Sequence, residues 1–418
     1  MFGQTTRRRF IQNGMAYVTI GLGIPQILVR AAEAAESAPA GSPAASGKIL
    51  VVIEMSGGND GLNTVIPYTD AGYARNRPVI GIPAASVRKI SSSVGLHPAM
   101  GAMGNMFDKG QLAVVTGVGY PNPNRSHFFS MDVWQTATEE ASVTNRTGWL
   151  ARYFDCDGHF KGDPLSGVTL GSSLPLALTS VDDPVSVIGD GNNYGFQAID
   201  GDRAKHLRAI ESMYTGGTAA IDHADFVRNV GHEAYLSSEE LKRAIAVYDV
   251  KAASAAKYPI GNGLANSLQT VAKLITGGVS TRVYYLNIGG FDTHADQPRV
   301  HAQVLNQLSE AISAFYADLE LQGRANDVTL MTFSEFGRRV KENGSAGTDH
   351  GAASVLFVAG AGVKGGVYGD YPSLTDLDQG DLKHHTDFRS VYATLLDKWL
   401  GTPSNPILGG DYAHLNFV

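Results

Sequence analysis

Five acidic and imidazole side chains lie in or next to short glycine-rich segments, where the backbone can present them to a ligand. These residues are Asp60, Asp292, His294, Glu335 and His350. Carboxylate and imidazole groups together suit Zn²⁺, Mn²⁺ or Mg²⁺, and carboxylates favour the harder ions. A pair of such ions would clamp a tetrahedral anion and activate an attacking oxygen. The sequence therefore predicts that these residues hold one or two divalent metal ions.

Each of these residues also has an ordinary structural alternative. Asp60, which follows Ser-Gly-Gly-Asn, is well placed to cap a turn or a helix. Asp292 and Thr293 are equally good capping residues, and Glu335 has Arg338 and Arg339 nearby as ion-pair partners. Both interpretations stay open at this point.

A second group, Arg125-Ser126-His127, follows a turn rich in proline and asparagine. A metal would activate the Ser126 hydroxyl as a nucleophile. Arg125 would bind the anionic substrate, and His127 would act as an acid or support a ligand. The alternatives are that Ser126 caps a helix beginning at His127 or Phe128, and that His127 is a core histidine. The chain has no Gly-x-Ser-x-Gly sequence, which argues against an ordinary serine hydrolase.

Three further histidines are weaker candidates. His384 and His385 come just before a predicted helix, and we interpret them as structural or substrate-facing residues. His97, which precedes a proline, is typical of a turn.

The elements that must position these side chains are five apolar runs. We expect buried strands, as in a parallel sheet, at 49–53, 112–116, 283–288, 328–333 and 355–358. The polar clusters follow the ends of four strands, and Asp349-His350 precedes the fifth. In open α/β sheets, ligands bind at the carboxyl edge. The candidate residues are therefore predicted to converge there.

Helices are expected between and after these strands. Apolar residues from Val300 to Leu319 recur every three or four positions, and Gly323 then ends the helix. Another helix is predicted over 387–400. This alternation indicates an α/β fold with a mostly parallel central sheet and helices on both faces. Residues 200–278 read as mostly helical, and we interpret them as an insertion or cap.

The N-terminal 35 residues have the layout of a secretory signal. Arg7-Arg8-Arg9-Phe10 precedes an apolar stretch and then a small-residue segment, which is the twin-arginine form. The apolar stretch is shorter than the roughly 20 residues of a membrane-spanning helix. Residues 36–47 are predicted to be a flexible linker, and 48–418 the folded domain. The protein should therefore be exported folded to the periplasm or beyond by the twin-arginine machinery, with no stable membrane span after cleavage.

Composition narrows the possible functions. The formal net charge is -7, whereas nucleic-acid binding needs a basic surface. Cys156 is the single cysteine, so an internal disulfide, a thiolate-rich metal site and the usual cysteine ligation of iron–sulfur clusters are excluded.

Several long segments together resemble an exported bacterial family known as a domain of unknown function, DUF1501. They are SGGNDGLNTVIPY, NPNRSHFFSMDVWQTA, GGFDTHADQ, MTFSEFGRRVKENGSAGTDHG and TDFRSVYATLLDKWLG. That family in turn resembles the alkaline phosphatase and sulfatase superfamily, which places metals at strand ends. The resemblance implies an alkaline-phosphatase-like fold in which Ser126 stands where the nucleophile stands. It also implies metal-ligand positions for Asp60, Asp292, His294, Glu335 and His350.

The sequence departs from the superfamily pattern in three places. Asp292 and His294 are separated by one residue instead of three, and Ser334-Glu335 stands where an Asp-His pair is usual. Pro121 occupies the position of the modified cysteine or serine of sulfatases, so sulfatase chemistry of that type is not expected.

The leading hypothesis is a periplasmic, metal-dependent hydrolase of phosphate or sulfate esters, acting on a small anionic ester. The first alternative is a non-catalytic exported binding or scaffold protein with the same fold. The second is an exported oxidoreductase, although the chain lacks a Gly-x-Gly-x-x-Gly segment after a strand.

Overall fold

A computed structural model describes residues 47–139, 147–157, 165–180, 185–188, 240–241 and 243–418. The predicted signal (1–35) and almost all of the predicted linker (36–47) lie outside the described residues, as do residues 200–239 of the predicted insertion. Among the described helices, none is both long enough and apolar enough to cross a membrane.

The centre of the molecule is a nine-stranded sheet. Its strands run in the order β11-β5-β10-β9-β1-β8-β6-β7, and β14 pairs with β5 at one end. They are β1 (Ile49–Met55), β5 (Leu112–Gly119), β6 (Gly167–Leu170), β7 (Ser186–Ile188), β8 (Val283–Ile288), β9 (Val328–Phe333), β10 (Ser354–Gly360), β11 (Gly366–Tyr368) and β14 (Thr386–Asp387). The five predicted strands are all present.

The sheet is mostly parallel, as predicted. β1 pairs in parallel with β8 and β9, β6 pairs in parallel with β8 and β7, and β5 pairs in parallel with β11 and β14. β10 runs antiparallel to both of its neighbours, β5 and β9. The amino end of β10 therefore lies at the edge where the other strands have their carboxyl ends. As a result, the residues just before β10 lie at the same edge as the residues just after β1, β5, β8 and β9.

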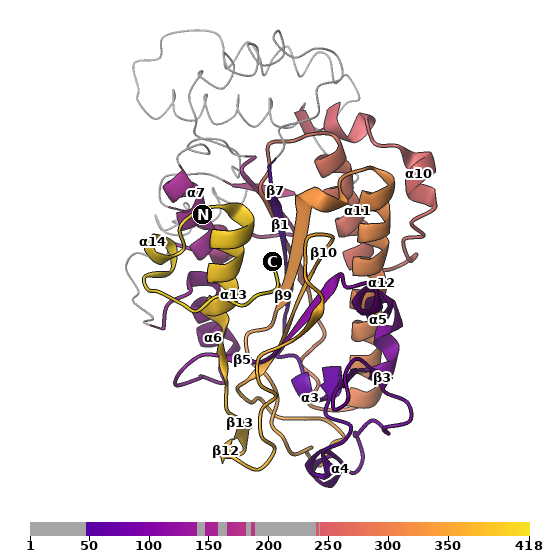
Figure 1. Ribbon diagram of the computed structural model, residues 1–418, viewed down its shortest axis with the longest axis vertical. Helices are drawn as coiled ribbons and strands as arrows, with labels where there is room; N and C mark the ends of the chain where they lie inside the picture. The colour runs from indigo at the N-terminus through magenta and orange to yellow at the C-terminus, as the bar shows by residue number, and fades with distance from the viewer. Residues whose placement is uncertain (1–46, 140–146, 158–164, 181–184, 189–239, 242) are drawn as a thin grey trace, which may run out of the picture.

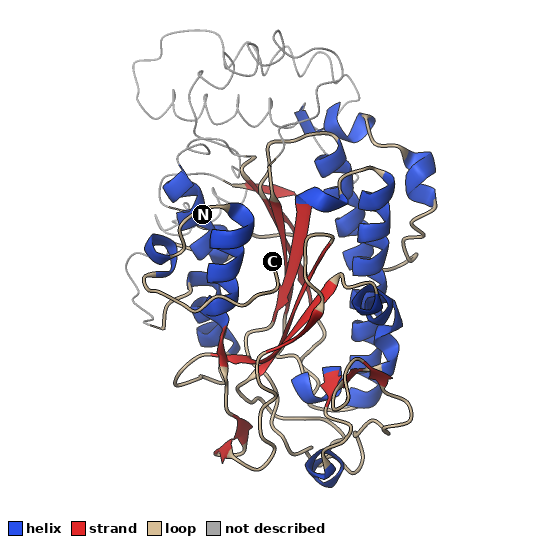
Figure 2. Cartoon of the chain, viewed as in Figure 1, coloured by secondary structure: helices blue, strands red, loops and turns tan. Residues whose placement is uncertain are grey.

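Helices cover both faces of the sheet (Figures 1 and 2). One face carries α5 (Gly101–Asp108), α11 (Gly263–Thr276) and α12 (Gln297–Leu321). The other carries α6 (His127–Thr136), α7 (Trp149–Asp157), α13 (Phe388–Thr394) with the π-helical turn Leu395–Leu400, and α14 (Asn405–Leu408). Strand β1 shows how one run of residues serves both faces: Val51 and Ile53 belong to the first core, while Leu50 and Val52 belong to the second.

The helix predicted from Val300 to Leu319 is α12, which begins three residues earlier and ends at Leu321. The described part of the 200–278 segment is mostly helical. α11 packs against α12 and β8, and Leu268 and Val271 are fully buried in the first core. α11 therefore belongs to the helical layer of the main domain. The short helix α10 (Val250–Ser254) lies at the end of the molecule opposite α3 (Gly61–Thr64), which follows β1 (Figure 1).

Small elements close the carboxyl edge of the sheet. They are β2 (Val65–Ile66), α4 (Ala71–Asn76), β3 (Arg88–Lys89), β4 (Gly95–Leu96), the 3-10 turn Pro98–Met100, β12 (Leu377–Asp378) and β13 (Asp381–Leu382). Two further 3-10 turns, Leu176–Leu178 and Ala325–Asp327, lie elsewhere in the chain.

Candidate metal centre

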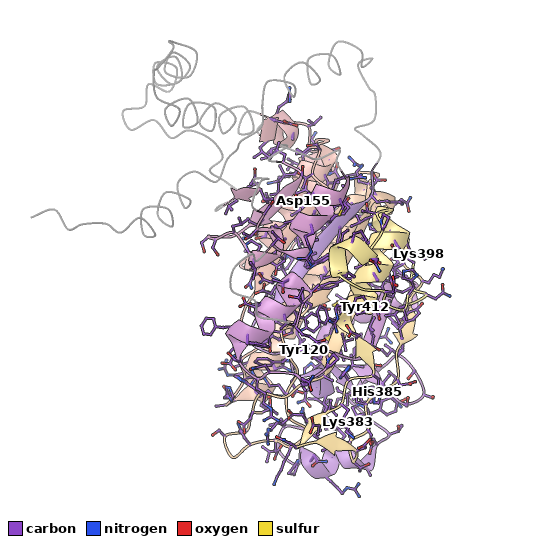
Figure 3. The ribbon with its side chains drawn as sticks, turned by 90° about the vertical axis from the view of Figure 1, so that its left-hand side faces the viewer. Tyr120, Asp155, Lys383, His385, Lys398 and Tyr412 are labelled. Carbon is purple, nitrogen blue, oxygen red and sulfur yellow. The ribbon has the colours of Figure 1, made fainter. Side chains whose placement is uncertain are left out.

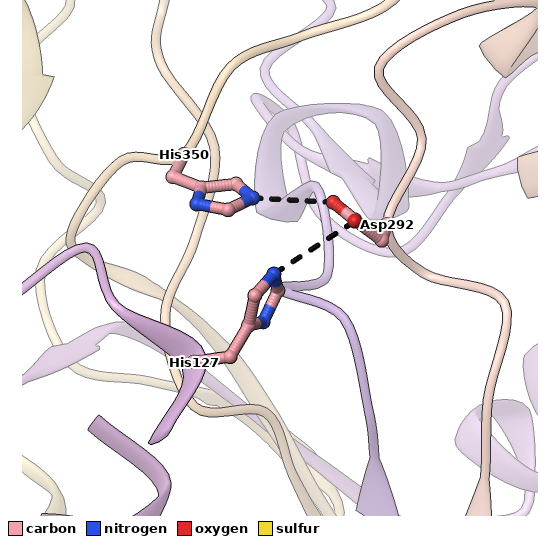
Figure 4. A group of neighbouring side chains, drawn as sticks. All are labelled: His127, Asp292 and His350. Atoms are coloured by element: carbon pink, nitrogen blue, oxygen red, sulfur yellow. Dashed lines mark hydrogen bonds and ion pairs between the residues drawn. The ribbon is translucent and has the colours of Figure 1, made fainter. Parts of the chain in front are cut away.

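Three predicted site residues from different parts of the chain meet at the carboxyl edge of the sheet. One nitrogen each of His127 and His350 and one oxygen of Asp292 all lie within 4.8 Å of one another. His350 Nε2 is 3.2 Å from Asp292 Oδ1, and His127 Nε2 is 3.8 Å from Asp292 Oδ2 (Figure 4). We call His127, Asp292 and His350 the His/Asp cluster.

The sheet explains why these residues meet. His127 begins α6, which follows β5, and Asp292 lies four residues after β8 ends. His350 lies four residues before β10, and reaches the same edge because β10 is reversed. The ring of Phe336, from the loop after β9, supports both imidazoles, with ring centroids 4.9 Å from His127 and 4.6 Å from His350.

The Nδ1 atoms of both histidines are held by hydrogen-bond acceptors. His127 Nδ1 is 2.7 Å from Glu335 Oε1, and His350 Nδ1 is 2.9 Å from the backbone carbonyl of Arg125. A carbonyl oxygen can only accept, so His350 Nδ1 carries a proton. Glu335 Oε1 also accepts the Gly57 amide at 2.9 Å, so the carboxylate acts as an acceptor for His127 as well. In the neutral rings, the Nε2 atoms therefore carry no proton, and their lone pairs can coordinate a ligand in the cluster.

His294 extends the cluster toward solvent. Its Nε2 lies 2.9 Å from His350 Nε2 and 3.1 Å from Asp292 Oδ1, while its Nδ1 is 3.5 Å from Asp349. The His294 side chain is 45% exposed, so a ligand can approach from this side.

Arg338 fixes the position of Asp292. Its guanidinium is fully buried and donates to Asp292 Oδ1 at 2.6 Å. It also donates to the carbonyls of Gly58 and Thr348, at 2.7 and 2.8 Å, and to those of Gly57 and Phe291. One side chain thus ties together the loops after β1 and β8 and the loop before β10.

The surroundings set the ionisation of the cluster. Burial acts to raise the pKa of Asp292, but the hydrogen bond and charge of Arg338 outweigh it, so the pKa lies below its usual value. Burial lowers the pKa of His350, although its hydrogen bond to the Arg125 carbonyl acts in the opposite direction. Both shifts favour an ionised carboxylate beside a neutral imidazole.

Asp60 is not brought into the cluster. Its buried carboxylate caps α3 by accepting the amides of Leu62 and Asn63, and it accepts from the side chains of Arg77 and Gln297. Burial would raise the pKa of Asp60, but the charge and hydrogen bond of Arg77 bring it below the usual value. In this structure Asp60 therefore has the capping role that was the alternative to metal binding.

Glu335 takes a supporting position. It contacts His127 and not Arg338 or Arg339, and its side chain is almost fully buried. Arg125 contributes through its backbone, because its Nε donates to Asp381 at 2.7 Å and its side chain is thereby held away from an anion role. Arg338 and Phe336 were missed as site residues by sequence reasoning. The only signal for them was their place directly after Glu335.

Ser126 occupies the N-cap position of α6, but its side chain makes no capping hydrogen bond. Its backbone amide donates to Asn124 Oδ1 at 2.7 Å, and the residue is exposed. The Ser126 hydroxyl, one residue before His127, is thus not used in capping the helix. His97 caps the 3-10 turn Pro98–Met100 by accepting the Ala99 amide, as expected of a turn residue.

The chain has low similarity to several solved structures of other proteins. The chain is similar to a protein in the alkaline phosphatase superfamily from Vibrio parahaemolyticus, at 9% identity and a TM-score of 0.39, with 94% of this chain and 79% of that chain covered. It is similar to the PsFucS1 sulfatase from Pseudoalteromonas sp. at 10% identity and a TM-score of 0.38, covering 97% and 74%. The lipoteichoic acid synthase LtaP from Listeria monocytogenes matches at 9% identity and a TM-score of 0.36, covering 87% and 76%.

Among curated proteins, none has a sequence that matches this chain. The family model described as "Protein of unknown function (DUF1501)" matches residues 47–403, which is nearly all of the predicted folded domain. The chain therefore belongs to the DUF1501 family, as the sequence motifs predicted.

Proposed function

We propose that this protein is a metal-dependent hydrolase of phosphate or sulfate esters. The observation that carries the proposal is the orientation of the two imidazoles. Acceptors hold both Nδ1 atoms, so two Nε2 lone pairs and the Asp292 carboxylate face one another. Acceptor atoms at these distances repel unless a proton or a cation lies between them, and a divalent ion satisfies all three.

The distances fit one ion. Ligand bonds to zinc from histidine nitrogen or carboxylate oxygen are about 2.0–2.2 Å, so neighbouring ligand atoms lie about 3–4 Å apart. The cluster separations of 3.2 and 3.8 Å fall in that range. Glu335 and the Arg125 carbonyl would hold the ligating rings in place, as second partners of metal-bound histidines commonly do. His294 is placed to complete the ligand set from the solvent side.

The bound ion would neutralise the substrate anion and lower the pKa of an oxygen nucleophile. Ser126 is the proposed nucleophile, because its hydroxyl is exposed, is not used for capping and precedes His127 directly. Its oxygen would bond to phosphorus or sulfur while the ester's alcohol leaves with the proton. Water would then release phosphate or sulfate and restore the serine.

The proposed site of action is the periplasm or the cell exterior. The support is the twin-arginine pattern Arg7-Arg8-Arg9-Phe10 with its apolar and small-residue segments. Export in the folded state would allow the metal to be bound before translocation.

A second candidate function is cation-dependent binding without catalysis. Two observations favour it: the Asp60 carboxylate and the Arg125 guanidinium, both expected in the catalytic apparatus, are committed to protein partners. Among the described residues, one group suited to a metal is found, so a second ion has no comparable site there.

Ester hydrolysis separates these functions. Purified protein would be supplied in turn with Zn²⁺, Mn²⁺ and Mg²⁺ and assayed with aryl phosphates, phosphodiesters and aryl sulfates. We expect turnover with at least one metal, and a loss of at least about 100-fold in Ser126→Ala, because removing a nucleophile removes the covalent route.

Ser86→Ala is the matched control, since Ser86 is an exposed serine on the loop before β3. Turnover that survives in Ser126→Ala would contradict the nucleophile assignment. Metal binding without turnover on any ester would favour the binding function instead.

A further inference from the structure

A cavity of about 270 Å³ lies beside the metal centre. Its lining comes from the end of β5 and the loop that follows (Gly119 to Pro123), from Trp134 on α6, and from the β12–β13 region and its continuation to His384. Figure 3 shows Tyr120 and Lys383, which are both part of this lining, in the same lower part of the molecule. Ligand pockets for drug-sized molecules are commonly about 300–1,000 Å³, so this cavity is suited to a ligand of about one ring.

Glu335 connects the cavity to the His/Asp cluster. Glu335 is part of the cavity lining, and its Oε1 is 2.7 Å from Nδ1 of His127. A group bound in the cavity therefore lies one side chain away from the candidate metal position. Ala352 and Ala353, which follow His350, line the same cavity, so the loop before β10 contributes to both.

The walls of the cavity are largely apolar. Tyr120, Pro123 and Leu382 provide apolar surface, and the Trp134 ring is held by stacking on Phe388 with centroids 4.4 Å apart. The indole nitrogen of Trp134 is itself shielded from solvent, so this residue contributes apolar ring surface to the wall and no hydrogen bond.

The charges in the lining disfavour anionic groups and favour hydroxyl groups. Glu335 is a buried carboxylate and Asp378 an exposed one, so an anionic group inside the cavity would meet two like charges. The ammonium group of Lys383 is already paired with Asp376 at 2.5 Å. Carboxylates and the Asn122 amide instead suit hydroxyl groups, which both donate and accept.

We propose that this cavity binds an uncharged, hydroxylated ring of monosaccharide size, the alcohol part of the ester whose anionic group lies at the metal centre. The substrate class would then be sugar phosphates or sugar sulfates. This inference rests on the proposed hydrolase function for the ester part, but ring binding itself does not require the metal.

Saturation-transfer NMR on the full chain after dialysis against EDTA tests ring binding alone. The probes are glucose, galactose and mannose at millimolar concentration, with phenol as a ring of similar size that lacks the additional hydroxyls. We expect transfer to at least one hexose in preference to phenol. Because no metal is present, failure here would leave the hydrolase proposal standing, and failure to bind metal would leave ring binding standing.

Three variants locate the binding. Leu382→Trp fills the cavity and should abolish transfer to the hexose. Asn122→Gly removes the side-chain amide at a position whose φ of +50° glycine also adopts, and it should weaken hexose binding about two- to tenfold, the usual effect of one hydrogen bond. Gln379→Gly is the matched control, because Gln379 also has a φ of +50° but lies outside the cavity lining, and this variant should bind as wild type does.

The proposal is overturned if no hexose binds, if phenol binds in preference, or if a natively folded Leu382→Trp still binds the hexose. Circular dichroism establishes the fold of that variant. Should Leu382→Trp not fold, Asn122→Gly decides the matter, and unchanged affinity in it overturns the proposal.

Discussion

At the scale of single residues, the site depends on the hydrogen-bond acceptor at the Nδ1 atom of each imidazole. His127 and His350 are both turned by an acceptor at Nδ1, one a carboxylate and one a backbone carbonyl. The sequence predicted Asp292 and His350 as metal ligands from their residue types, and His127 as an acid or a support for a ligand. It could not identify the acceptors, because a backbone carbonyl has no residue signature and Glu335 is equally suited to a ligand role.

Glu335→Gln should weaken metal binding about 10- to 100-fold, the usual cost of losing a partner of a metal-bound histidine. The amide is nearly the same size as the carboxylate, but it no longer offers two equivalent charged acceptors to His127. Competition against a fluorescent zinc chelator measures the affinity. Glu342→Gln, on a carboxylate that caps the amides of Val79 and Ile80, is the control. Equal affinity in Glu335→Gln and wild type would contradict the supporting role.

At the scale of elements, the site depends on close approach between loops after different strands. Gly57 and Gly58 follow β1 with φ of +120° and +77°. A Cβ at Gly57 would lie 2.4 Å from the Asp292 amide nitrogen, and one at Gly58 would lie 2.3 Å from the Phe336 ring. The glycines are therefore required both for their backbone conformation and for the space that the site takes.

Gly58→Ala should destabilise the fold by about 1–3 kcal/mol, because it combines an unfavourable φ with a clash. It should also weaken metal binding, since Phe336 supports both imidazoles. Urea denaturation and metal titration measure the two effects. Gly289→Ala is the control, because that position has no atom within 4 Å of an added Cβ. Wild-type stability and affinity in Gly58→Ala would show that the loops do not need this contact.

The elements themselves were predictable to different degrees. The β8 and β9 runs matched residue for residue, because buried strands leave a continuous apolar signal. The reversal of β10 leaves no such signal, because its residues are buried on both faces as in a parallel strand. The position of α11 in the helical layer leaves no signal either, since an amphipathic helix has the same pattern whether it covers a sheet or forms a cap.

At the scale of the whole molecule, two apolar cores lie on either side of the sheet. Beneath the carboxyl edge lie two buried histidines, His97 and His301, with ring centroids 6.1 Å apart. Burial lowers the pKa of His97 to about 4 and that of His301 to about 3. Both are therefore neutral in the folded protein at neutral pH.

This burial predicts a loss of stability in mild acid. In the unfolded chain these histidines take up protons near a pKa of about 6.5, whereas in the folded chain they do so only below about 4. The unfolded state binds more protons between these values, so stability falls as the pH drops from about 6.5 toward 4. From pH 7 to 5 the loss should be about 2 kcal/mol per histidine.

Urea denaturation at several pH values measures this dependence. His301→Gln should be less stable at pH 7 but should show a shallower loss between pH 6.5 and 4. His385→Gln, on an exposed histidine, should keep the wild-type slope. A wild-type slope in His301→Gln would show that other groups cause the acid sensitivity.

Metal stoichiometry tests the central claim most directly. Equilibrium dialysis against Zn²⁺ or Mn²⁺, followed by elemental analysis, should give one tightly bound ion per chain in wild type. Asp292→Asn should lose that ion. Asp296→Asn, in the same loop but paired with Arg299, should keep it. Absence of a bound ion in wild type, or one ion per chain in Asp292→Asn, would contradict the assignment of His127, Asp292 and His350 as a metal site.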